Sequence, residues 1–251
     1  MELKVLGTVS PFNATHKTNG PGFLIVDGKN KIMLDCGSGV HRMLDIPSDM
    51  ENLCVFLSHL HRDHYVDIFT LQYASYTMHN LGRLKNPINI FLPERPISIF
   101  KDILSETAAY ANYTVIDENI SVDIGGTTVS FCQTDHPIQT YAIKVKNGEE
   151  TVVYTSDSSF TAKDRLVQFA QNADLLICES SLLKSYGFPE SNPHMTAEQA
   201  GIIAKEANVK KLMLTHFWPE EDPNNFLNEA KMIFPNTITA KEDSTHIISK
   251  I

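Results

Sequence analysis

The most constraining feature of this sequence is the heptapeptide SHLHRDH at residues 58–64, which directly follows the apolar run Leu53–Leu57. It holds three of the ten histidines in 251 residues. A five-residue apolar run indicates a strand buried on both faces, so the motif begins where a buried strand ends. Residues i and i+2 of an extended segment point the same way, so His59 and His61 are placed to reach one metal ion together.

Asp63 and His64 lie just past this pair, where the chain turns towards a helix, and we expect them to face a second metal nearby. Imidazole and carboxylate are ligands of Zn²⁺, with Mn²⁺ and Fe²⁺ as alternatives. Burying three imidazoles without a shared partner would cost free energy, and a bound metal would remove that cost.

Later strand-like runs also end at a histidine or an aspartate. These are His136 after 127–134, Asp157 after 151–155 and His216 after 211–214. Loops at one edge of a rigid sheet are where function usually resides. The side chains at four strand ends are therefore candidates for one shared site.

The remaining pattern predicts one α/β domain over residues 1–251, because no repeat, low-complexity tract or linker interrupts it. Helices are expected at 65–78, 97–110, 162–171, 197–207 and 225–234. Further strands are expected at 3–6, 23–26, 31–34, 88–92, 122–124, 141–146, 175–178, 237–240 and 246–249. Helices interspersed with two groups of strands predict a sandwich of two packed mixed sheets with helices on the outer faces.

Composition restricts the classes of partner. The formal net charge is −9 and Lys and Arg are scattered, which argues against broad, charge-driven nucleic-acid binding. A small phosphorylated substrate stays compatible, because a metal site supplies its own positive charge. The apolar runs are shorter than a membrane span and the first residues do not resemble a secretory signal, so the cytoplasm is the expected compartment. The four cysteines, without a CxxC pair, are expected to be buried free thiols.

The motifs together resemble those of the metallo-β-lactamase superfamily, whose fold is an αββα sandwich. They occur in the family's order at 34–39, 58–64, 134–136, 155–158 and 214–217. The resemblance implies that Asp35, in the first motif, orients a metal-binding histidine without touching the metal.

Within the superfamily, the stretch 193–200, PHMTAEQA, resembles the His-x-Thr-Ala stretch of ribonuclease Z and its phosphodiesterase relatives. Thr196 and Gln199 fit a capping box that opens a helix. His194 then lies just outside the helix N-terminus, beside a favourable place for an anionic phosphate. Glu179, at the end of the strand-like run 175–178, is a candidate hydrogen-bond partner for a catalytic or supporting histidine.

The resemblance implies two Zn²⁺ per chain, or Mn²⁺ or Fe²⁺ in their place. The implied ligands are His59, His61 and His136 for one metal, Asp63, His64 and His216 for the other, and Asp157 for both. A hydroxide bridging the metals would attack phosphorus. Asp63 and His194 are the candidate catalytic residues, with His194 as an imidazolium that neutralises the phosphoryl oxygens or protonates the leaving group.

Two departures argue against tRNA maturation. Twenty residues lie between His136 and Asp157, and no long basic arm appears. The loop 11–20, PFNATHKTNG, also lacks the basic Pro-x-Lys-x-Arg-Asn pattern of tRNA-processing members. We therefore expect a small or medium phosphodiester substrate, no membrane association and, by analogy with relatives, a homodimer.

Other hypotheses of function stay open. The same site would suit a lactone, carboxylic ester or sulfate ester metallohydrolase, and a third alternative is an RNA-binding or tRNA 3′-end processing protein. Phe160, Phe217 and Trp218 are interpreted mainly as core or rim packing, with stacking on a substrate ring as the alternative. The histidines without partner spacing are expected to have no part in the site, namely His16, His41, His79 and His246.

Overall fold

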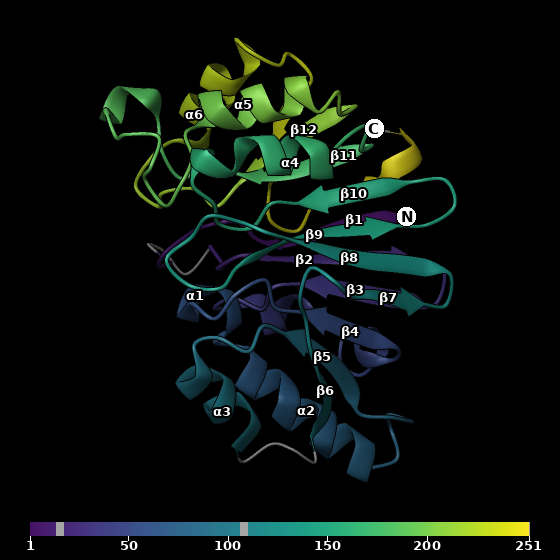
Figure 1. Cartoon of the computed structure of the whole chain (residues 1–251). Helices are drawn as coiled ribbons and strands as arrows, with labels where there is room; N and C mark the ends of the chain where they lie inside the picture. The colour runs from purple at the N-terminus through teal and green to yellow at the C-terminus, as the bar shows by residue number, and fades with distance from the viewer. Residues whose placement is uncertain (14–17, 106–109, 251) are drawn as a thin grey trace.

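A computed structural model describes residues 1–13, 18–105 and 110–250. Two seven-stranded mixed sheets pack face to face, and helices cover both outer faces (Figure 1). This confirms the predicted αββα sandwich. The two chain termini lie side by side, with the Ile248 amide donating to the Met1 carbonyl at 3.0 Å.

The first sheet has the order β14-β1-β2-β3-β4-β5-β6. Its strands are β1 (Glu2–Gly7), β2 (Gly22–Asp27), β3 (Asn30–Leu34), β4 (Leu53–Phe56), β5 (Ile88–Leu92), β6 (Ala111–Val115) and β14 (Thr245–Ile247). The strands from β3 to β6 are parallel. The loops that follow β3 and β4 therefore leave the sheet side by side at the same edge.

The second sheet has the order β13-β12-β11-β10-β9-β8-β7. Its strands are β7 (Ser121–Ile124), β8 (Thr127–Gln133), β9 (Tyr141–Lys146), β10 (Thr151–Tyr154), β11 (Leu175–Glu179), β12 (Lys211–Thr215) and β13 (Thr237–Thr239). The strands from β10 to β13 are parallel, and β8 runs in the same direction because both it and β10 are antiparallel to β9. The loops after β8, β10, β11 and β12 thus emerge at one edge.

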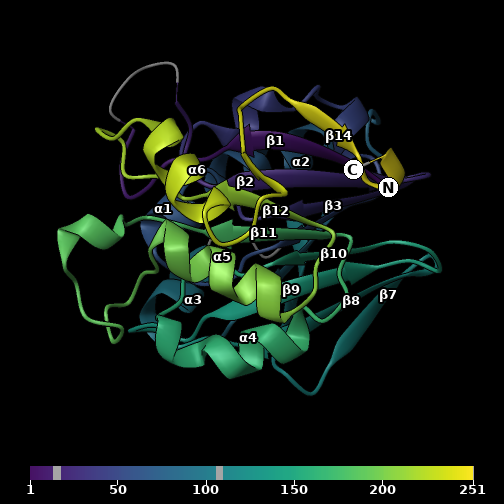
Figure 2. The ribbon, with the colours of Figure 1, turned by 90° about the horizontal axis from the view of Figure 1, so that it is seen from above.

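Helices on the outer face of the first sheet are α1 (Arg62–Tyr65), α2 (Ile68–Asn80) and α3 (Ile97–Ser105). On the second sheet they are α4 (Lys163–Phe169), α5 (Ala197–Glu206) and α6 (Pro223–Lys231), seen from above in Figure 2. Short 3₁₀ turns are η1 (Val40–Met43), η2 (Ser48–Met50), η3 (Phe160–Ala162), η4 (Lys184–Tyr186) and η5 (Ile248–Lys250). None of the described helices has both the length and the apolar character that crossing a bilayer requires.

Strand β4 shows how the sequence specifies these layers. Its side chains alternate: Cys54 and Phe56 point into the core between the sheets, whereas Leu53 and Val55 point to the helices outside. Alternate side chains of a strand face opposite sides, so an apolar run with no polar position is what a strand covered on both faces requires. The inter-sheet core is closed by large buried rings, including Phe23 and Tyr154.

The structure differs from the expected helix at 65–78, which is broken into α1 and α2. The break occurs at Val66 and Asp67, where the Asp67 carboxylate accepts the His41 amide at 3.1 Å and meets the His41 ring at 2.7 Å. The Asp67 amide in turn donates to the Cys36 carbonyl at 3.1 Å and not to a carbonyl one turn earlier. Val66 and Asp67 keep right-handed dihedral angles, so tertiary hydrogen bonds interrupt the helical bonding pattern without turning the chain away.

Three further points differ from the expectations or extend beyond the described residues. Strand β6 was not predicted, because among its five residues only Ala111 is buried and the apolar alternation is weak. All four cysteines are free thiols as expected, but Cys132 is half-exposed and not buried. Helix α3 ends at Ser105, and the last part of the expected helix 97–110 includes 106–109, which lie outside the described residues.

Helix α5 begins with the predicted capping box. Thr196 Oγ1 accepts the Gln199 amide at 3.2 Å, and Gln199 Oε1 accepts the Thr196 amide at 2.9 Å. Two amides at the start of the helix are thereby satisfied reciprocally. The box fixes the point at which the chain that carries His194 enters the helix.

Replacing the capping hydroxyl is expected to cost stability. The substitution Thr196→Ala should lower the free energy of unfolding by about 1 kcal/mol, because it leaves a helix amide without its acceptor. Urea denaturation measures this, and Thr196→Ser, which keeps the hydroxyl, should stay close to the wild type. A Thr196→Ala protein as stable as the wild type would show that the box does not contribute.

Candidate metal centre

The loops at the ends of the strands converge at the end of the sandwich that carries α1, away from the chain termini (Figures 1 and 2). Potential ligand atoms gather there within 4.8 Å of one another in overlapping groups. The groups are His59, His61, His136 and Asp157; Asp63, His64 and His216; and Asp157, His194 and His216. The structure thus brings together every side chain that the sequence indicated as a metal ligand.

The first group presents three ring nitrogens to one point. His61 Nδ1 lies 3.1 Å from His59 Nε2 and 3.0 Å from His136 Nε2. Asp157 Oδ2 is 3.5 Å from His59 Nε2 and 3.7 Å from His136 Nε2. Ligand nitrogens around a tetrahedral zinc ion stand about 3.3 Å apart, so the spacing fits such an ion.

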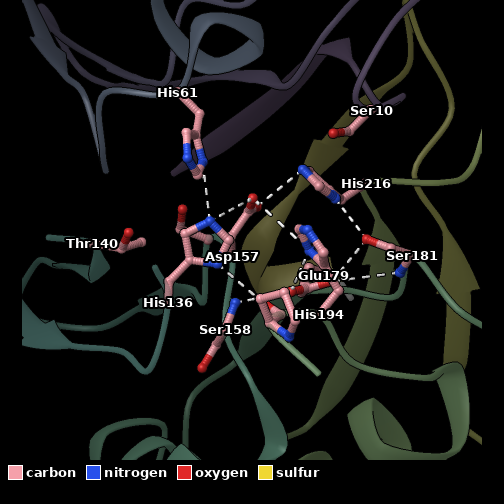
Figure 3. A network of polar contacts seen from close by, with 12 residues as sticks. Ser10, His61, His136, Thr140, Asp157, Ser158, Glu179, Ser181, His194 and His216 are labelled. Atoms are coloured by element: carbon pink, nitrogen blue, oxygen red, sulfur yellow. Dashed lines mark hydrogen bonds and ion pairs between the residues drawn. The ribbon is translucent and has the colours of Figure 1, made fainter. Parts of the chain in front are cut away.

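The second group is built around the other oxygen of the same carboxylate. Asp157 Oδ1 lies 3.3 Å from His64 Nε2 and 3.0 Å from His216 Nε2, and these two nitrogens are 3.1 Å apart. Asp63 Oδ2 completes the group at 3.6 Å from His64 Nε2. Asp157 therefore faces both groups at once, as Figure 3 shows for its contacts with His136 and His216.

The described protein atoms alone cannot satisfy every polar atom of this centre. Asp157 Oδ1 is buried and has no hydrogen-bond donor among the described residues. The facing imidazole nitrogens also cannot all be donors, because two N–H groups pointing at each other repel. Buried polar groups in this state are costly, and bound cations would satisfy them. The donor set of imidazoles and carboxylates fits divalent ions of the zinc type.

Protonation states in the first group suit coordination, which requires neutral imidazole and ionised carboxylate. Burial is the main cause that lowers the pKa of His59, His61 and His136. Burial would raise the pKa of Asp157, but the neighbouring His216 and His64 outweigh it and hold that pKa well below its usual range.

In the second group, neighbouring charges outweigh the effect of burial. Burial would lower the pKa of His64, yet Asp157 and Asp35 together hold it well above its ordinary value. Burial would likewise raise the pKa of Asp63, but His64 and His216 keep it lowered. Carboxylates therefore surround this imidazole, and they would equally stabilise a cation placed among them.

Each buried imidazole is oriented from behind by an oxygen atom. The contacts are His59 Nδ1 to Ser58 Oγ at 3.0 Å, His64 Nδ1 to Asp35 Oδ2 at 2.8 Å, His136 Nδ1 to the Pro193 carbonyl at 3.1 Å and His216 Nδ1 to Ser181 Oγ at 2.7 Å. Such contacts fix the tautomer and the direction of the metal-facing nitrogen. Asp35 thus makes the histidine contact that was expected of the first motif.

Sequence reasoning missed the hydroxyl groups that complete this support. Ser10 Oγ donates to Asp63 Oδ2 at 2.6 Å, and Tyr154 donates to Asp35 Oδ2 at 2.8 Å. Ser58 directly precedes His59 and Ser181 lies two residues after Glu179, so their positions in the sequence could have indicated a role in the site. Ser10 has none, because it reaches Asp63 only through the tertiary fold.

Backbone geometry at the strand ends is unusual. Asp35, Ser156 and His216 adopt positive φ angles of 60°, 53° and 62°. For residues with a side chain this left-handed conformation costs about 1–2 kcal/mol each. It turns the chain sharply after β3, β10 and β12, and all three positions adjoin or belong to the centre.

Glycine in the first motif serves close packing. A Cβ atom on Gly37 would lie 2.3 Å from the Asp63 carbonyl oxygen, and one on Gly20 would lie 2.9 Å from the same atom. Only glycine permits these backbones to touch the segment that carries Asp63. The motif thus fixes the position of the loop after β4.

His194 lies at the edge of the centre in contact with Glu179. Its Nδ1 is 3.2 Å from Glu179 Oε1 and 3.9 Å from Asp157 Oδ2. Burial would lower the pKa of His194, but Glu179 outweighs it and raises this pKa to about 9. The expectation that Glu179 contacts a histidine is confirmed.

Glu179 also connects His194 to the second group. Its Oε1 accepts the Ser158 amide at 2.8 Å and its Oε2 accepts Ser181 Oγ–H at 2.8 Å (Figure 3). Because Ser181 donates to Glu179, its oxygen accepts the proton on His216 Nδ1. One buried carboxylate therefore orients His216 through Ser181 and His194 directly.

A cavity of about 520 Å³ opens over the centre. Its lining includes His61, Asp63, Asp157 and His194, with Leu60 and Ile99 on the apolar side. The histidines expected to be incidental lie elsewhere: His41 pairs with Asp67, His79 meets the Leu84 carbonyl and His246 meets Ser244. His16 lies outside the described residues.

Comparisons with known proteins agree with this geometry. A model of the β-lactamase superfamily domain matches residues 30–217. The probable metallo-hydrolase YhfI of Bacillus subtilis is 33% identical over 235 residues, covering 93% of this chain and 94% of that protein. The crystal structure of the metallo-β-lactamase fold protein YhfI matches with a TM-score of 0.86 and 32% identity, over 98% of this chain and 99% of the other.

Ribonuclease Z of Chlamydia trachomatis serovar L2 is 26% identical over 293 residues, covering 96% of this chain and 95% of that protein. This alignment is longer than the 251 residues of the chain, so the relative carries inserted segments. The crystal structure of the short form of human tRNase Z matches in fold, with a TM-score of 0.73 and 21% identity over 99% of each chain.

Removing the Ser10 hydroxyl is expected to weaken metal binding. The substitution Ser10→Ala takes the donor from Asp63 Oδ2, and loss of such a contact typically lowers metal affinity by 10–100-fold. Competition with a chromophoric chelator measures the affinity for each of the two zinc equivalents, and one of the two affinities should fall.

Ser48→Ala is the matched control for this measurement, because the Ser48 hydroxyl bonds only to Asp45 among the described contacts, on the exposed turn η2. It should bind zinc as the wild type does. An unchanged zinc affinity in Ser10→Ala would mean that Asp63 needs no such support.

Proposed function

Because the chain belongs to the metallo-β-lactamase superfamily of metal-dependent hydrolases, we propose that it is a dinuclear phosphodiesterase acting on small or medium phosphodiesters. The observation that carries the proposal is the position of Asp157, which turns one oxygen to each group of imidazoles while His194 stands beside it. The ribonuclease Z relatives support phosphodiester chemistry.

The proposed ligand sets follow the two groups of the structure. They are His59, His61 and His136 for one ion, Asp63, His64 and His216 for the other, and Asp157 for both. Zinc is the proposed metal, with Mn²⁺ and Fe²⁺ as alternatives. Two such ions would acidify a water molecule and offset negative charge on the phosphoryl oxygens.

His194 is proposed to donate a proton to the leaving group. Its Nδ1 is engaged by Glu179, which leaves Nε2 as the nitrogen that meets the substrate in the cavity. The Glu179 carboxylate stabilises the imidazolium and fixes the plane of the ring. Asp63, held by Ser10 on the cavity lining, is proposed to accept a proton from the attacking water.

Three features support a substrate smaller than tRNA. The net charge is −9, the cavity over the centre measures about 520 Å³, and the ribonuclease Z relative carries segments that this chain lacks. Cavities of this volume hold molecules of the size of a dinucleotide or smaller. A homodimer and a cytoplasmic location stay predictions from the sequence.

The role of His194 predicts a dependence on the leaving group. His194→Ala should lower kcat by about 100-fold on a dinucleoside phosphate, whose alkoxide leaving group needs a proton. The loss should be smaller on bis(p-nitrophenyl) phosphate, whose phenolate leaves without one. The measurement is steady-state hydrolysis of both substrates by zinc-loaded protein, with metal content determined in parallel.

His79→Ala is the matched control, because His79 is exposed at the end of α2 and contacts the Leu84 carbonyl. It should leave both rates unchanged. Equal losses on the two substrates in His194→Ala would contradict proton donation. Zinc-loaded wild-type protein that is inert on every phosphodiester but opens lactones or thioesters would contradict the proposed function.

A further inference from the structure

A second cavity of about 260 Å³ adjoins the one over the metal centre. The two share Pro11, Arg62 and Asp63, so both open onto the same proposed metal ligand. His194 lines only the larger cavity. A group in the smaller cavity would therefore be attached to the phosphoryl group on the side away from the proposed proton donor.

One wall of the smaller cavity is an exposed aromatic ring. Phe12 lines it and is 48% exposed. Trp218, which is 38% exposed, meets Phe12 edge to face, with ring centroids 5.9 Å apart and an interplanar angle of 83°. The contact supports the Phe12 ring from one side, and the exposed part of the ring is available for stacking.

This aromatic wall is fixed relative to the metal centre. The Ser10 amide donates to the Phe217 carbonyl at 3.1 Å, and the Phe217 amide donates to the Thr8 carbonyl at 2.9 Å. The segment that carries Phe12 is thus bonded to the segment that carries His216 and Trp218. Ser10 Oγ ties the same segment to Asp63. A wall held in this way loses little entropy when a ligand binds.

The opening of the cavity carries one cation. Arg62 occupies the variable position of the HxHxDH motif, between His61 and Asp63, and its side chain is exposed. Among the described residues that line the two cavities it is the one Lys or Arg. A guanidinium matches the geometry of a phosphate group. Because the chain has a net charge of −9, the Arg62 cation would attract a phosphate group locally and not through the charge of the whole protein.

We propose, on the basis of the proposed function, that the smaller cavity binds the nucleoside that carries the scissile phosphate, with its base on Phe12 and a second phosphate on Arg62. Phe12 and Arg62 are then the residues that determine specificity, and Trp218 is a positioning residue that acts through Phe12. The volume of about 260 Å³ is just below the usual range of ligand pockets, so one nucleoside fits and a folded RNA does not.

Three substrates with one leaving group test this subsite. They are the p-nitrophenyl phosphodiesters of methanol, of thymidine through its 5′ oxygen, and of thymidine 3′-phosphate through the same oxygen. The bond broken is identical, so ratios of kcat/KM report only the added group. The thymidine ester should exceed the methyl ester by about ten-fold, as stacking of one base on an aromatic ring implies. The added 3′-phosphate should give a further gain of several-fold.

Variants assign each gain to its residue. Phe12→Ala should remove most of the gain from thymidine, and Arg62→Ala should remove the gain from the 3′-phosphate. The matched controls are Tyr73→Ala and Arg83→Ala, which replace an exposed ring and an exposed cation away from both cavities. These controls should retain both ratios. Since each ratio is taken within one protein, a general loss of activity in a variant does not affect it.

Binding provides a second measurement that needs no turnover. Trp218 is the single tryptophan of the chain and touches Phe12, so its fluorescence should change when thymidine 3′,5′-bisphosphate binds. The dissociation constant should rise at least five-fold in Phe12→Ala and in Arg62→Ala, but not in the two control variants.

The outcomes separate this subsite from the proposed function. Hydrolysis of all three esters with equal kcat/KM, and no fluorescence change at saturating bisphosphate, would overturn the subsite and leave the phosphodiesterase intact. A saturable fluorescence change that depends on Phe12 and Arg62, without hydrolysis of any ester, would support the subsite and contradict the phosphodiesterase.

Discussion

The structure depends on one buried carboxylate, that of Asp157, which stands between two groups of imidazoles. An isolated ionised carboxylate in a protein interior is strongly unfavourable unless it is paired. Here each oxygen faces ring nitrogens at 3.0–3.7 Å, and one oxygen lacks a donor among the described residues. Cations between the carboxylate and the imidazoles would resolve the conflict, and metal binding would then be thermodynamically coupled to folding of this edge.

The same constraint explains the layer of hydrogen bonds around the centre. Asp35 is fully buried, yet it accepts the Ser58 amide at 2.7 Å, the Ser58 hydroxyl at 2.9 Å and the Tyr154 hydroxyl at 2.8 Å, besides holding His64. Ser58 follows β4 of the first sheet, whereas Tyr154 ends β10 of the second. A satisfied buried carboxylate therefore joins the two sheets at the point where the ligands must converge. Burial, with the charge of Asp35, raises the pKa of Tyr154 well above its ordinary value, which keeps the hydroxyl a donor.

Local patterns explain why much of this was predictable. The two-residue spacing of His59 and His61 after a buried strand, and the return of histidine or aspartate at later strand ends, are properties of short segments. Contacts between distant segments produce no such pattern in the sequence. Ser10 reaches Asp63 across 53 residues and Tyr154 reaches Asp35 across 119, and the break before α2 depends on Asp67 meeting His41. Strand β6 pairs with β5 although its own residues show little alternation.

Residues beside the proposed metal ligands can influence substrate specificity without binding the metals. With the proposed ligand sets, metal coordination would fix the residue type at positions 59, 61, 63 and 64, but it would place no demand on position 62. The backbone that would present His61 and Asp63 to the metals also places the side chain of residue 62, here Arg62, on the lining of both cavities. Phe12 is likewise carried by the segment that Ser10 anchors to Asp63. Substrate preference can thus change through substitution of residues that are not proposed metal ligands. The chemistry at the centre and the packing that supports it would stay the same.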